Sequence, residues 1–154
     1  MLLTTNFSLD EFESKDGSSM PYTVLQNVKE LANALQVIRD HFGVPVTITS
    51  GYRSPAHNDT IEGAVKGSQH TLGKAADLKV QGKTAREMYD GIEMLIDKGL
   101  IPQGGLGLYS NRVHYDIRGT KARWGVSADN AKKGFLGVLG GLVLTWFIGK
   151  QMGL

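Results

Sequence analysis

The sequence contains no cysteine, so no disulfide can form and cysteine usage does not indicate a redox compartment. An excess of one charge is also lacking, because 17 lysines and arginines stand against 15 aspartates and glutamates. No basic stripe interleaved with aromatic residues is present, which argues against nucleic acid as a partner. The N-terminus has no basic segment followed by a long apolar run, so we expect no secretory signal peptide and synthesis in the cytoplasm.

The composition is otherwise that of a globular protein. With 154 residues, of which 41% are hydrophobic and 21% charged, the chain is long enough for one domain with a substantial core. The residue pattern changes close to Gly125. We therefore expect a folded domain over 1–125, a linker over 126–133 and a hydrophobic helical tail over 134–154.

The tail contains an uncharged run over residues 134–149 that has no polar face. A surface helix of a small domain would need such a face. As a helix the run would extend only about 24 Å, which is short for a membrane span. Gly137 and Gly141 are spaced for close helix packing. We expect membrane association through this run. The alternatives are contact with a helical partner, including a second copy of the chain in a homo-oligomer, and docking into a larger particle such as a virion.

Hydrophobic periodicity predicts the main elements of the domain. Apolar residues recur at helical spacing from Val24 to Ile38, which predicts a helix that ends at Gly43. Further helices are predicted from Leu9, capped by Ser8, and over 85–98, capped by Thr84. Strands are predicted over 44–50, 75–80, 105–109 and 112–118. Helices packed on a small, mainly antiparallel sheet make this an α+β fold.

Two stretches of the sequence carry metal-binding residue types. His70 and Asp77 lie seven residues apart with Gly73 between them, and His114 and Asp116 alternate along an apolar strand. Alternate strand residues share a face, so His114 and Asp116 can face one pocket. Two imidazoles and a carboxylate can form a three-ligand zinc site with the fourth position left for water. The spacing alone leaves open whether these residues are ligands or unrelated polar side chains.

The complete motif is more specific. Ser-x-His-x-x-Gly-x-Ala-x-Asp over 68–77, followed by His-x-Asp, resembles the D-alanyl-D-alanine carboxypeptidase-like zinc peptidases. These enzymes share a fold with hedgehog signalling domains and cut the peptide stems of bacterial peptidoglycan. The resemblance runs from about Asn6 to Trp124 and includes Asn6–Phe12, Thr47–Pro55, Gly104–Tyr109 and Val113–Asp116. It implies Zn²⁺ held by His70, Asp77 and His114.

The resemblance also implies roles in binding and turnover. Arg53 matches the arginine that follows Gly-Tyr in the family, where it binds substrate and stabilises the oxyanion. A planar, permanently charged fork suits that task; the alternative is a surface arginine on a turn. Ser68 matches a serine that hydrogen-bonds the substrate, and its alternative role is to cap a turn.

The general base is the point where the sequence departs from the family. Many relatives place a glutamate, aspartate or histidine three residues before the last zinc histidine, and here that position is Asn111, which cannot titrate. Asp116 is the nearest replacement, because strand alternation puts it on the ligand face. Its alternative role is to accept the N–H of a ligand histidine and fix its tautomer.

The leading function is a zinc peptidase, carboxypeptidase or endopeptidase, that acts on peptidoglycan at the bacterial cell wall. The Asn111 departure supports an alternative, a catalytically weak module of the same fold that binds the wall or has a structural role in a virion or membrane. An apolar tail without a signal peptide makes the chain similar to lysis or entry enzymes of the bacteriophage type, such as endolysins.

Overall fold

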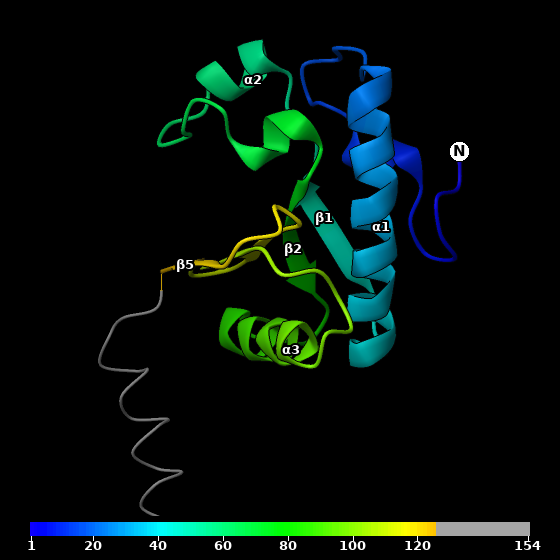
Figure 1. The fold of residues 1–154 in the computed structure, drawn as a ribbon, viewed down its shortest axis with the longest axis vertical. Helices are drawn as coiled ribbons and strands as arrows, with labels where there is room; N and C mark the ends of the chain where they lie inside the picture. Colours follow the sequence, from blue (N-terminus) through cyan, green and yellow to red (C-terminus); the bar gives the residue numbers. More distant parts are fainter. Residues whose placement is uncertain (126–154) are drawn as a thin grey trace, which may run out of the picture. The chain divides into compact units, whose positions relative to one another are not determined.

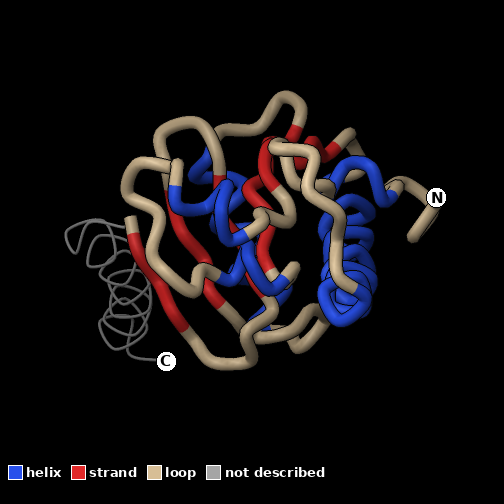
Figure 2. Tube along the Cα trace, turned by 90° about the horizontal axis from the view of Figure 1, so that it is seen from above, coloured by secondary structure: helices blue, strands red, loops and turns tan. Residues whose placement is uncertain are grey.

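A five-stranded mixed sheet lies at the centre of the computed structural model, which describes residues 1–125. The strand order is β1-β2-β4-β3-β5, and neighbouring strands are antiparallel except for the parallel pair β3 and β5. Figure 2 shows the strands side by side. Their bounds are Val46–Ser50 (β1), Ala75–Val80 (β2), Gly105–Leu108 (β3), Val113–Asp116 (β4) and Ala122–Trp124 (β5).

Helices cover this sheet, which confirms the predicted α+β class. The long helix α1 runs beside β1, and α3 lies near the C-terminal end of α1 (Figure 1). Contacts of α3 reach β2, β3 and β4. The helical elements are Leu9–Phe12 (η1), Tyr22–Phe42 (α1), Pro55–Asp59 (α2), Gln69–Leu72 (η2) and Ala85–Asp97 (α3), where η marks a 3₁₀ helix.

Both long helices follow from their sequences. In α1 the residues predicted to face inward are buried, and the helix ends where Gly43 adopts a left-handed conformation, with φ of 68°. In α3 the Thr84 hydroxyl accepts from the backbone N–H of Glu87 at 3.1 Å. The Glu87 carboxylate in turn accepts from the backbone N–H of Thr84 at 2.7 Å, which completes a capping box. These predictions are confirmed.

Among the strands of residues 1–125, β5 is the one that the sequence did not predict. It has only three residues, too few for a recognisable period of apolar and polar side chains, and all three are half-buried. Long-range contacts hold it in place, because the Arg123 guanidinium pairs with Glu93 of α3 and donates to the carbonyl of Gly104. Such a short strand is therefore specified by its neighbours in space.

The predicted linker and hydrophobic tail lie outside the described residues, so their predicted structure and partners stay predictions. Within residues 1–125, none of the helices combines the length and the apolar character that a membrane crossing requires.

One carboxylate ties the loop before α1 to the N-terminus of α2. Asp16 accepts from the Ser54 hydroxyl at 2.6 Å and from the Ser14 hydroxyl at 2.7 Å. Ser54 also caps α2 by accepting from the backbone N–H of His57 at 3.1 Å. The hydrogen bonds from Ser54 and Ser14 hold the pKa of Asp16 well below its usual range.

This network predicts a pH-dependent contribution to stability. Because the folded protein lowers the pKa of Asp16, its contribution is present above the unfolded value of about 4 and is lost as the pH falls. We expect Asp16→Asn to lower the midpoint of thermal unfolding at pH 7, and the difference from wild type to shrink progressively below about pH 4. Circular dichroism melts between pH 7 and pH 3 measure this. A difference that stays constant over that range would contradict the prediction.

Candidate metal centre

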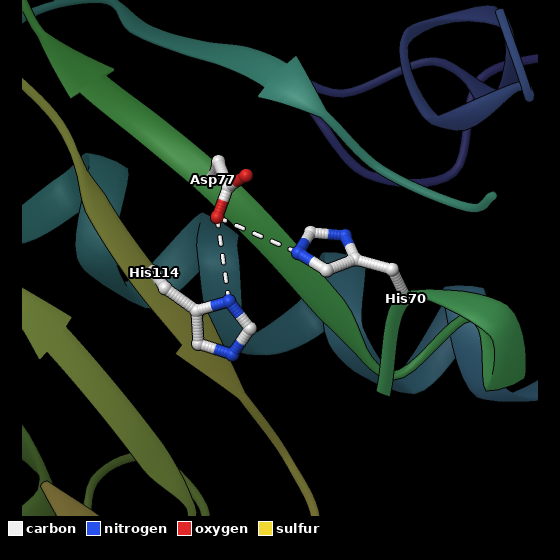
Figure 3. A group of neighbouring side chains, drawn as sticks. All are labelled: His70, Asp77 and His114. Atoms are coloured by element: carbon white, nitrogen blue, oxygen red, sulfur yellow. Dashed lines mark ion pairs between the residues drawn. The ribbon is translucent and has the colours of Figure 1, made fainter. Parts of the chain in front are cut away.

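Three elements bring together the residues predicted to hold a metal. His70 lies in η2, Asp77 in β2 and His114 in β4, and all three point toward one spot (Figure 3). The antiparallel register places Asp77 directly opposite His114. The turn from η2 into β2 passes through Gly73, whose φ is 69° and where a Cβ would overlap Val24 of α1. Only glycine meets both conditions at this turn.

The three side chains form a compact, buried cluster. One oxygen of Asp77, Oδ1, lies 3.5 Å from His70 Nε2 and 3.3 Å from His114 Nδ1. The candidate ligand atoms of all three residues lie within 4.8 Å of one another. The sequence motif therefore does bring these residues into one site that can hold a metal ion.

The other nitrogen of each imidazole ring has its own partner. His70 Nδ1 lies 2.8 Å from the carbonyl oxygen of Gly51, and His114 Nε2 lies 2.7 Å from a carboxylate oxygen of Asp116. Carbonyl and carboxylate oxygens only accept, so these nitrogens carry the hydrogen. In the neutral rings the nitrogens that face Asp77 then have free lone pairs. Two imidazole lone pairs and a carboxylate oxygen converge, which is the donor set that suits zinc.

Burial and hydrogen bonds shift the pKa values of this cluster. Burial raises the pKa of Asp77, but the hydrogen bonds with His114 and His70 outweigh it and hold the pKa well below its usual range. Burial lowers the pKa of His114, whereas hydrogen bonds with Asp116 and Asp77 raise it, with a net upward shift. The carboxylates thus favour positive charge at this spot, which a proton or a metal cation can supply.

Asp116 lies on the side of His114 that faces away from Asp77. Its carboxylate is fully buried and accepts from the backbone N–H of Gly105 at 2.9 Å and from two nitrogens of the Arg118 guanidinium at 2.8 and 2.7 Å. Burial raises the pKa of Asp116, but hydrogen bonds from His114, Arg118 and Gly105 outweigh it and hold the pKa well below its usual range. These contacts favour the tautomer-fixing role of Asp116 over the role of general base.

Arg53 lies at the cluster and is not a free surface residue. Its side chain is only 12% exposed, and its Nη2 lies 3.3 Å from Asp77 Oδ2, the oxygen that does not face the histidines. Its Nε donates to the Ser50 hydroxyl at 3.1 Å. The backbone N–H of Arg53 donates to the carbonyl of His70 at 3.1 Å. The guanidinium is therefore fixed beside the candidate metal position.

The structure also places the two remaining polar residues of the sequence analysis. The Ser68 hydroxyl accepts from the backbone N–H of His70 at 3.3 Å, so it caps η2, and the residue also lines the cavity above the cluster. Asn111, which occupies the position of the general base in many relatives, does not line that cavity. It lines a second cavity instead.

A cavity of about 580 Å³ opens over the cluster. Trp124 forms part of its wall, with its ring centre 4.9 Å from that of His114, and its indole N–H donates to the Tyr109 hydroxyl at 3.1 Å. Glu62 also lines the cavity and, within residues 1–125, is its only carboxylate besides Asp77. No sequence motif marks Glu62, because it is an exposed acidic residue in a loop.

The glycine-rich stretch before β4 allows close packing at this site. A Cβ at Gly105 would overlap the Asp116 carboxylate, and a Cβ at Gly107 would overlap the Trp124 indole. Close backbone packing beside the metal is the role that the sequence predicts for these glycines, and the contacts at both positions confirm it.

The fold and the cluster define an α+β domain with a buried candidate metal centre at the base of a cavity. A protein-family model described as Peptidase M15 matches residues 5–116, which is well over half of the chain. The protein therefore belongs to the Peptidase M15 family, which confirms the family resemblance in the sequence. No curated protein matches the chain significantly.

Proposed function

We propose that this protein is a zinc peptidase that cleaves peptide bonds in the stem peptides of bacterial peptidoglycan. The observation that carries the proposal is the convergence of His70 Nε2, Asp77 Oδ1 and His114 Nδ1 at the base of the cavity. Membership in a peptidase family gives this donor set a hydrolytic context. Zinc held there would lower the pKa of a bound water and polarise the scissile carbonyl.

The chain's own residues supply the remaining parts of such a site. Arg53 is fixed by Asp77 and Ser50 and places a permanent positive charge where negative charge develops on the carbonyl oxygen. Asp116 holds the ring of His114 and its tautomer. Glu62 is the carboxylate on the cavity wall that is left to accept the proton of the attacking water and deliver it to the leaving amine.

The alternative function is a wall-binding module with the same centre and little turnover. Asn111 at the usual position of the base favours it, because this side chain cannot transfer a proton. The two functions share the metal site and differ only in whether a bond is broken.

Digestion of purified peptidoglycan with the full chain separates the two. We expect zinc-loaded protein to release new amino and carboxyl termini, which mass spectrometry of the fragments locates. Treatment with a chelator should abolish the release, and added zinc should restore it. Zinc-dependent binding to the wall without any new termini would instead establish the module.

A further inference from the structure

A second cavity adjoins the candidate metal centre. It has a volume of about 330 Å³ and shares Arg53, Ile61, Asp77 and Arg112 with the larger cavity. A group bound in this second cavity therefore lies next to the same Asp77 and Arg53 that flank the candidate metal position. A peptide cleaved at the centre can place the residue beside its scissile bond there.

The second cavity is strongly basic. Four cationic side chains line it against a single carboxylate, which belongs to Asp77. That carboxylate already faces His70, His114 and Arg53. Within residues 1–125, Lys15 and Lys79 form no ion pair at all. The cationic residues are Lys15, Arg53, Lys79 and Arg112.

Arg112 is the cationic residue best placed to bind an anion. Its guanidinium lies over the Tyr109 ring, 4.3 Å from the ring centre, and its side chain is 39% exposed. Its nearest carboxylate oxygen is Asp77 Oδ2 at 4.0 Å, too far for a hydrogen bond. The guanidinium groups of Arg53 and Arg118 are by contrast already hydrogen-bonded to carboxylates. Stacking holds the Arg112 fork in place while its donors stay available.

We propose that this second cavity is a subsite for a carboxylate of the substrate, with Arg112 as the residue that binds it and Lys79 and Lys15 as supporting charges. The inference rests on the proposed peptidase function. It adds that the substrate carries a negative charge next to the bond that is cut. A carboxylate matches the planar, two-pronged geometry of arginine. The substrate carboxylate comes either from the C-terminus of the stem peptide or from the side chain of an acidic residue within the stem peptide.

Two pairs of synthetic stem peptides test the subsite with the full, zinc-loaded chain. In one pair the C-terminus is a free carboxylate or an amide, and in the other the carboxylate of the acidic residue is free or amidated. We expect wild-type protein to prefer the free acid in one pair by roughly 10- to 100-fold in kcat/KM, the range for a hydrogen bond to a charged group. The effect should appear mainly in KM and decrease with added salt. The pair that responds identifies the source of the carboxylate.

Substitutions then assign the preference to the cavity. We expect Arg112→Gln to remove most of the preference by slowing cleavage of the acid more than cleavage of the amide, and Lys79→Gln to remove part of it. Lys98→Gln is the matched control, because it removes the same charge from an exposed lysine that lines neither cavity. Zinc content and circular dichroism of each variant show that it is folded.

The outcomes separate the subsite from the peptidase function. Equal cleavage of acid and amide in both pairs by wild-type protein would overturn the subsite and leave the peptidase function standing. A preference that Lys98→Gln reduces as much as Arg112→Gln would also overturn it, because the effect would then be one of overall charge. Cleavage of none of the four peptides would overturn the peptidase function itself, and the subsite with it.

Discussion

Replacing His70 with alanine is expected to abolish zinc binding and peptidase activity while the domain stays folded. The imidazole supplies one of three converging donors, and two remaining ligands hold zinc far more weakly than three. The fold should survive, because the main core of α1, α3 and the sheet does not depend on this ring. Zinc content after dialysis, measured by mass spectrometry, and circular dichroism check the two parts.

His41→Ala is the matched control for this variant. His41 is an exposed histidine near the end of α1 that lines neither cavity, so its loss should leave zinc content and activity unchanged. A His70→Ala protein that retains one zinc per chain would refute the proposed ligand set, whatever its activity.

Replacing Asp116 with asparagine is expected to weaken zinc binding by roughly 10- to 100-fold, the usual effect of removing a partner of a ligand histidine. The amide cannot supply the negative charge that faces His114 Nε2 and Arg118 in the folded protein. Activity should return toward wild type when zinc is saturating, because Asp116 acts through His114. Zinc titrations and rates at increasing zinc concentration measure both effects.

Glu62→Gln is the matched comparison, since it also exchanges a carboxylate for an amide. Glu62 is the proposed proton acceptor and no metal ligand, so the Glu62→Gln protein should bind zinc with wild-type affinity. Its kcat should fall on the order of 10²- to 10⁴-fold at any zinc concentration. The opposite pattern, with normal zinc affinity and a zinc-independent loss of rate in Asp116→Asn, would make Asp116 the general base after all.

Local sequence determined most elements of the fold and supplied the residue types of the metal cluster. The apolar spacing of α1, the capping box of α3 and Gly43 are short-range signals, because a helix is set by residues three and four apart. The motif from Ser68 to Asp77 placed His70 before the turn at Gly73 and Asp77 after it. Strand alternation then put His114 and Asp116 on one face.

Only the tertiary structure decided what each of these side chains meets. Alternation could not tell which nitrogen of His114 faces Asp116, because that depends on the pairing of β4 with β2 and on the space that Gly105 leaves. Contacts across the fold also join Arg112 with Lys15 and Lys79 in one cavity and hold β5 against β3. Pairing between distant strands leaves no period in the sequence. The sequence therefore showed which residues could bind a metal, but it did not show which side chains contact them.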